Sequence, residues 1–189
     1  MTKRKREWIE WLVLIAVVAV LYFTGLGTVV MGSLQRVVLA PGLIKPEILS
    51  EREQVNTSFS FYLKDENGER RSFEEFKGKT VFLNVWATWC PPCIAEMPDI
   101  HSLYEEMKGD SVEFVMISRD ADFSQAIEFV IKKGYDFPIY SAVSRLPPEL
   151  SSRSIPSTFV ISPEGYIVAK KIGMAKYNYE GFQNFLREL

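Results

Sequence analysis

The sequence predicts an α/β domain in which helices flank a mixed central sheet, together with an N-terminal transmembrane helix. Strand-like and helix-like segments alternate over residues 58–189, which favours an α/β sandwich. Two pairs of strand-like runs each enclose a turn, so the sheet should contain antiparallel hairpins as well. An apolar run at residues 11–35 carries no charge and exceeds the roughly 20 residues that cross a bilayer.

The N-terminal apolar run has the features of an uncleaved membrane anchor. It follows a basic cluster at residues 3–6, and basic residues favour the cytoplasmic side of a membrane. Trp8 and Trp11 suit one membrane interface. A cleaved signal peptide is the alternative, but its apolar region is normally ~7–15 residues long and ends in an Ala-x-Ala-like site. Here the run is longer, and the one tolerable site, at Ala40, is followed by Pro41.

These patterns divide the chain into four parts. We expect a cytoplasmic basic tail at residues 1–10, a transmembrane anchor at 11–31, a stalk at 32–57 and a folded domain at 58–189. The single span would place the folded domain on the periplasmic, extracytoplasmic side of the cytoplasmic membrane, where disulfides persist. Without the basic tail the remaining chain is acidic, so we expect no nucleic-acid partner.

The first half of the folded domain contains a hairpin, a helical turn and a central strand. Residues 59–63 alternate between apolar and polar side chains and precede a turn at 65–68, which predicts the hairpin. Two phenylalanines at 73 and 76 mark a short helical turn that ends at Gly78. Residues 81–87 are nearly all apolar, as expected for a strand covered on both faces.

The second half alternates between helices and strands before it closes with a hairpin and a helix. We expect a helix from residue 92 to 107, a buried strand at 112–118, and an amphipathic helix at 123–133 that ends at Gly134. The remaining expected elements are a sheet-pairing segment at 137–140, a helical turn after Pro147 and Pro148, a hairpin formed by 158–162 and 166–171, and a closing helix at 179–189.

The most informative motif is a Cys-x-x-Cys formed by Cys90 and Cys93, which are the two cysteines of the chain. The motif lies where the expected central strand gives way to a helix. The first thiol would therefore lie at a helix N-terminus, where unpaired backbone N–H groups and the macrodipole favour a thiolate. The second thiol is about one turn away, close enough to attack a mixed disulfide. The motif indicates a redox-active pair.

The chain resembles the membrane-anchored thioredoxin-like proteins of the TlpA/ResA family, in the AhpC/TSA-redoxin superfamily, over residues 55–189. Four stretches carry the resemblance: residues 78–93, which contain the cysteine motif, then Glu-Met-Pro at 96–98, Ile-Pro-Ser-Thr-Phe at 155–159 and Ser-Pro-Glu-Gly at 162–165. The resemblance implies a thioredoxin-like fold with an added N-terminal hairpin. It also implies that the protein is a thiol–disulfide oxidoreductase, specifically a protein-disulfide reductase.

The resemblance further implies a role for each residue of the site. Cys90 would be the exposed nucleophile with a lowered pKa, and Cys93 the buried resolving thiol. Pro156 would follow a cis peptide bond next to the cysteines and leave the Ile155 backbone free to pair with an extended substrate. The expected substrate-binding residues are Trp89, Pro91, Pro92, Ile155 and Pro156.

Glu96 is the third expected catalytic residue, after Cys90 and Cys93. It shares a helix face with Cys93. A partly buried carboxylate near two thiols would have a raised pKa and could take up or return a proton during exchange. The plain alternative is a glutamate that stabilises the first turn of the helix. In thioredoxin a buried Asp stands six residues before the first cysteine, whereas this chain has Asn84 there, so a relay through that Asp is absent.

Reduction of disulfides in exported proteins is the implied function, for example in apocytochrome c during cytochrome c maturation. An integral-membrane thiol relay would donate the electrons. Two alternative functions stay open. The protein could be an oxidant or isomerase that uses the same cysteines, or a tethered binding module with an inert disulfide. A peroxidase is disfavoured because Ala87 stands where such a site needs Thr or Ser. We expect a monomer with no metal and no cofactor beyond the Cys90–Cys93 disulfide.

Overall fold

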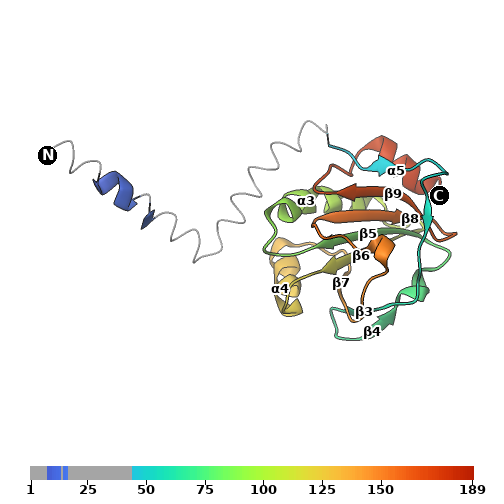
Figure 1. Cartoon of the computed structure of the whole chain (residues 1–189), viewed down its shortest axis with the longest axis horizontal. Helices are drawn as coiled ribbons and strands as arrows, with labels where there is room; N and C mark the ends of the chain where they lie inside the picture. The colour runs from blue at the N-terminus through green and yellow to red at the C-terminus, as the bar shows by residue number, and fades with distance from the viewer. Residues whose placement is uncertain (1–7, 14, 17–43) are drawn as a thin grey trace.

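The computed structural model describes residues 8–13, 15–16 and 44–189 (Figure 1). Within these residues no helix combines the length and the apolarity that a membrane span requires. The predicted anchor and the first part of the predicted stalk fall mostly outside the described residues. The organisation of the chain before residue 44 therefore stays a prediction.

A mixed sheet of nine strands forms the centre of the folded domain. The strands are β1 (Glu47–Ile48), β2 (Val55–Asn56), β3 (Tyr62–Asp65), β4 (Arg70–Ser72), β5 (Thr80–Trp86), β6 (Val112–Ser118), β7 (Ile139–Ala142), β8 (Ser157–Ile161) and β9 (Tyr166–Ile172). Their order is β1-β9-β8-β5-β6-β7-β3-β4, which Figure 1 shows from β9 at the top to β4 at the bottom. The β5–β6 and β6–β7 pairs are parallel and the others antiparallel, so the predicted mixed sheet is confirmed.

All three described helices of the domain pack on one face of the sheet. They are α3 (Pro91–Glu106), α4 (Phe123–Lys133) and α5 (Glu180–Arg187). Their buried residues join one apolar cluster with Phe82 and Phe114 of the sheet. Asp122 caps the start of α4 by accepting a hydrogen bond from the Ser124 amide, and Gly134 ends it with a φ of 68°, so the predicted bounds of this helix are confirmed.

The opposite face is covered by the N-terminal hairpin region and two short 3-10 helices, η1 (Phe73–Phe76) and η2 (Pro148–Leu150). Phe61 stacks on Phe73 with ring centroids 4.2 Å apart. These rings pack in a second apolar cluster with Leu83 and Val85 of β5. With both faces covered, all seven residues of β5 are buried, as the apolar run predicts.

Residues 44–57 differ from the predicted stalk because they belong to the sheet. Strands β1 and β2 both pair antiparallel with β9, and the Lys176 amide donates to the Ile44 carbonyl at 2.8 Å. The folded domain therefore begins before residue 58. Strands of two residues are too short to show an alternating pattern, and Pro46 is tolerated because it precedes an edge strand.

Candidate active site

Cys90 and Cys93 lie at the turn from β5 into α3. Cys90 is the N-cap of α3, with extended backbone angles, and its Sγ accepts a hydrogen bond from the Cys93 amide at 3.3 Å. Pro91 and Pro92 occupy the first two helical positions, where an amide would have no partner within the helix. The cysteine pair is thus held at the positive end of a sixteen-residue helix, as the sequence predicts.

The two cysteines form a disulfide, with Cα atoms 5.3 Å apart. Cys90 is 4% exposed and Cys93 is fully buried. Cys90 is therefore much less exposed than the sequence predicts, although it is the more accessible of the two. The reason is that both sulfurs belong to the apolar cluster on the helical face, together with Trp86 and Met97.

Glu96 is fully buried one turn after Cys93. Its Oε1 accepts a hydrogen bond from Asn84 Nδ2 at 2.9 Å, and its Oε2 accepts one from the Ala175 amide at 3.1 Å. Burial outweighs these two hydrogen bonds and raises the pKa of Glu96 to about 8. A carboxyl with this pKa is mostly protonated at neutral pH and can still release its proton near it, which suits proton exchange with thiols.

A buried polar network connects Glu96 to the C-terminal part of the chain. Asn84 Nδ2 also donates to Thr158 Oγ1 at 2.8 Å, and the Tyr177 hydroxyl donates to the same oxygen at 2.7 Å. Burial raises the pKa of Tyr177 well above its usual value, so its hydroxyl stays protonated. Sequence reasoning noticed Asn84 but missed Thr158 and Tyr177.

Two tryptophans near the cysteines differ in their surroundings. Trp89, directly before Cys90, is 58% exposed and is available to a partner. Trp86 is fully buried, and its ring centroid lies 5.7 Å from that of Phe129. Trp89 is therefore the surface residue of the two, and Trp86 belongs to the core.

The Ile155–Pro156 peptide bond is cis, as the sequence predicts. Pro156 is buried, and its carbonyl accepts a hydrogen bond from the Gly173 amide at 2.8 Å. Within residues 44–189, neither the amide nor the carbonyl of Ile155 has a hydrogen-bond partner. The half-buried Ile155 side chain packs against the same apolar cluster that contains the two cysteines. The cis-proline loop and the cysteine pair thus share one cluster.

A second polar cluster lies toward the far end of α3. His101 Nε2 is 2.8 Å from Asp136 Oδ1, and ligand-type atoms of His101, Glu105 and Asp136 lie within 4.8 Å of one another. The Lys108 ammonium lies 2.6 Å from an oxygen of Glu105 and 2.6 Å from one of Asp136. Its hydrogen bond lowers the pKa of Asp136 to about 2. The Lys108 ammonium already pairs with both carboxylates, so we interpret the cluster as a set of surface ion pairs and not as a metal site.

Comparison with known proteins decides the family. Residues 56–170 match the model of the AhpC/TSA family. The chain belongs to the AhpC/TSA family. Among its relatives is the thiol-disulfide oxidoreductase ResA of Bacillus subtilis, which is 33% identical over 130 residues, covering 68% of this chain and 73% of that protein. ResA of Halalkalibacterium halodurans is 34% identical over 130 residues, covering 68% and 74%.

Solved structures of similar proteins confirm the thioredoxin-like fold of this AhpC/TSA member. StoA from Bacillus subtilis aligns with a TM-score of 0.52 and 28% identity, covering 68% of this chain and 93% of that one. A DsbF homologue from Corynebacterium diphtheriae aligns with a TM-score of 0.60 and 24% identity, covering 77% and 92%. With the ResA relatives and the cysteine pair at bonding distance, the chain is a thiol–disulfide oxidoreductase of the TlpA/ResA type.

Proposed function

We propose that this oxidoreductase is a membrane-tethered reductase for disulfides of exported proteins. The observation that carries the proposal is the Cys90–Cys93 pair at the start of α3, one turn before a fully buried Glu96. The Cys90 thiolate attacks one sulfur of a client disulfide, forms a mixed disulfide and releases the other client sulfur as a thiolate. Cys93 then attacks Cys90, which releases the second client thiol and closes the Cys90–Cys93 disulfide.

Glu96 is proposed to manage the proton of the resolving step. Cys93 must lose its proton before it attacks Cys90, and the departing client sulfur must gain one. A carboxyl with a pKa of about 8 can accept or return a proton near neutral pH, whereas an exposed glutamate is ionised there and is a poor acid. Its position one turn after Cys93, on the same helix, supports this role.

The client is proposed to bind as an extended segment beside the cis-proline. The unpartnered amide and carbonyl of Ile155 offer one donor and one acceptor to such a segment. The exposed Trp89 ring supplies apolar contact area next to Cys90. The half-buried Pro91 and Pro92 complete the proposed surface around the disulfide, and Pro156 is buried directly after Ile155.

The proposed anchor, compartment and client are supported by the apolar N-terminal run and by the likeness to the ResA group. The apolar run at residues 11–31 would hold the domain on the extracytoplasmic side of the cytoplasmic membrane, and residues 32–43 would connect it to the sheet. We propose apocytochrome c as a client, an integral-membrane thiol relay as the electron donor, and a monomer as the working form.

The reduction potential of the Cys90–Cys93 pair tests the proposed direction of electron flow. The full-length chain, equilibrated with glutathione buffers, should give a value near the roughly −270 mV of thioredoxin. A value near the roughly −120 mV of DsbA would contradict the reducing role and indicate an oxidant. The absence of any exchange would indicate an inert disulfide in a binding module.

Two variants check the order of attack. Cys93→Ser should accumulate a mixed disulfide with a client, because the resolving thiol is missing. Cys90→Ser should form none. The reverse result, with the mixed disulfide in Cys90→Ser, would show that Cys93 attacks first.

A further inference from the structure

The segment that leads into Cys90 is held by one carboxylate from the neighbouring strand. Thr88 Oγ1 donates to Asp120 Oδ1 at 2.6 Å, and the Thr88 amide lies 3.2 and 3.1 Å from the two oxygens of Asp120. Asp120 follows the end of β6, which lies next to β5. The same carboxylate thus binds both the side chain and the backbone of a residue two positions before the attacking sulfur.

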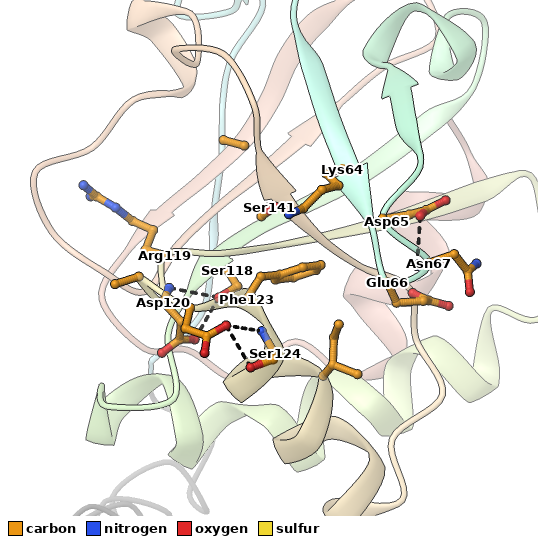
Figure 2. A pocket seen from close by; sticks show the side chains of 15 residues that line it. Lys64, Asp65, Glu66, Asn67, Ser118, Arg119, Asp120, Phe123, Ser124 and Ser141 are labelled. Carbon is orange, nitrogen blue, oxygen red and sulfur yellow. Dashed lines mark hydrogen bonds between the residues drawn. The ribbon is translucent and has the colours of Figure 1, made fainter.

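Asp120 is itself fixed in place. It is 9% exposed, its Oδ2 accepts a hydrogen bond from Ser118 Oγ at 2.8 Å, and its amide donates back to that oxygen at 3.0 Å. Ser118 and Asp120 line an open pocket of about 820 Å³. Figure 2 shows the two side chains near the start of α4. Within residues 44–189, no cation lies at ion-pair distance from Asp120. Its acceptor oxygens are therefore committed to Thr88 and Ser118.

The short stretch between β5 and α3 has anchors at only a few points. The Arg119 amide donates to the Trp86 carbonyl at 2.8 Å and continues the strand pairing to the end of β5. The Cys90 amide donates to the Ala87 carbonyl at 3.2 Å and closes a turn. Between them, Asp120 holds Thr88, and among residues 44–189 no hydrogen bond holds the exposed Trp89. Cys90 is joined to α3 on its other side, where the Ile94 amide donates to its carbonyl at 3.1 Å, so Thr88 is the point at which the segment before Cys90 is held from the neighbouring strand.

We infer that Asp120 is a positioning residue for the cysteine pair, acting through Thr88 to hold Cys90 at the N-terminus of α3 and Trp89 toward the client. Attack requires the sulfur to stay beside the Cys93 amide, which donates to it at 3.3 Å at the positive end of α3, since this position stabilises the thiolate. Released from Asp120, Thr88 lets the turn move and the sulfur loses that position. The inference rests on the proposed role of Cys90 as nucleophile.

Thr88→Val tests the inference in the full-length, reduced chain, because valine has the volume of threonine without its donor. Alkylation of Cys90 by iodoacetamide is followed against pH, with the labelled cysteine identified by mass spectrometry. We expect about a tenfold slower reaction at pH 7 and a higher pH midpoint, since less thiolate forms without the helix N-terminus. Thr88→Ser keeps the hydroxyl donor and should stay within about twofold of the unmodified chain.

A double variant tests whether Thr88 acts through Asp120. In an Asp120→Ala background, Thr88→Val should change the alkylation rate by less than about twofold, because residues that share one interaction are not additive. Full additivity of the two substitutions would overturn the inference. Asp120→Asn keeps the side-chain volume and one acceptor oxygen, so it gives a second variant if Thr88→Val does not fold. If Asp120→Asn shows the same pH midpoint of Cys90 alkylation as the unmodified chain, the positioning role of Asp120 is contradicted.

A second threonine–carboxylate hydrogen bond in the chain provides a matched control for an effect on stability alone. Glu149 accepts a hydrogen bond from Thr57 Oγ1 at 3.0 Å and from the Ser58 amide at 2.9 Å, in the N-terminal part of the domain. Thr57→Val should lower Tm without moving the alkylation midpoint. If Thr88→Val does the same and no more, Asp120 only stabilises the fold. If the unmodified chain shows no thiol exchange, the proposed function fails instead.

Discussion

Glu96 shows how two opposing effects decide the state of one residue. Its two hydrogen bonds, from Asn84 and from the Ala175 amide, favour the ionised carboxylate. Complete burial favours the neutral acid and has the larger effect, which leaves the pKa at about 8. An unfolded chain has no such burial, so its Glu96 returns to the ordinary value near 4.5. Folding therefore binds a proton at this residue over the pH range between these two values.

This proton should make the stability of the oxidised chain depend on pH. Between about pH 4.5 and pH 8 the folded state holds a proton at Glu96 that the unfolded state has lost, so the free energy of unfolding falls as pH rises. Over this range we expect Glu96 to contribute a decrease of roughly 3–5 kcal/mol, measured by urea unfolding at each pH. Glu96→Gln should remove most of this slope and stabilise the chain at pH 8.

An exposed glutamate of the same helix provides the control. Glu106→Gln alters a carboxylate at the other end of α3, at the surface, and should leave the slope in place. If Glu96→Gln retains the same slope as the unmodified chain, the burial of Glu96 does not control its titration.

The sequence predicts which residue types the site contains better than it predicts how deeply each of them is buried and what each of them contacts. Cys90, Cys93 and Glu96 stand at spacings that a helix brings to one end or one face, so local geometry is sufficient to predict their relative positions, while their catalytic roles stay a prediction. The burial of Cys90 depends on what packs over it from distant segments. The proposed role of Thr88 depends on Asp120, which lies 32 positions away, just after the end of β6. No local pattern contains that contact.

At the scale of elements, the N-terminal strands enlarge the sheet beyond the region that the sequence marks as folded. Strands β1 and β2 cover the edge of β9. The Leu49 amide donates to the Val168 carbonyl at 2.8 Å, and the Thr57 amide donates to the Gly165 carbonyl at 2.9 Å. This segment thus supplies hydrogen bonds that β9 would otherwise make with water.

Removal of these strands should destabilise the domain. A chain that begins at residue 58 should unfold at lower urea concentration than one that begins at residue 44, with a loss of at least about 2 kcal/mol from several backbone hydrogen bonds. Thr57 also loses its bond to Glu149 in the shorter chain. Equal midpoints and equal urea dependence for the two chains would mean that residues 44–57 form a detachable stalk.

Helix α4 and strands β1 and β2 show why some elements are predictable and others are not. Helix α4 has an N-cap at Asp122, a glycine at its end and an apolar face, so its bounds follow from sequence. Strands β1 and β2 have two residues each, which is less than one period of any pattern. They exist because β9 offers them an edge, and that edge is formed by a segment more than a hundred residues later in the chain.

At the scale of the whole molecule, the site is assembled from distant parts of the chain. The N-cap and the first turns of α3 supply the cysteines and Glu96, the segment after β6 supplies Asp120, and β8 supplies Thr158. Asn84 and Thr158 are 74 positions apart, yet they are direct partners in the β5–β8 register. A sequence alone shows polar residues within apolar strands but not which of them meet.

The proposed tether is also a property of the whole molecule. The full-length chain should sediment with the membrane fraction of its host, and removal of residues 1–43 should release an active domain. The basic cluster at residues 3–6 predicts an N-terminus in the cytoplasm, which places the domain outside the cytoplasmic membrane. A protease added to spheroplasts with an intact cytoplasmic membrane should therefore digest the domain. Protection of the domain in that experiment would contradict the proposed orientation, and release of the full-length chain would contradict the anchor.

The pairing of β5 with β8 has a consequence for the chain while it is being made. When Cys90 and Cys93 emerge from the ribosome during synthesis, the Cys-x-x-Cys motif is already complete. Strand β8 with Thr158, and Tyr177 after it, have not yet been synthesised. Glu96 is then surrounded by water and is an ordinary acid. Its unusual affinity for a proton arises only when the last strands dock on β5. The cysteines are thus translated before the surroundings that should control their chemistry.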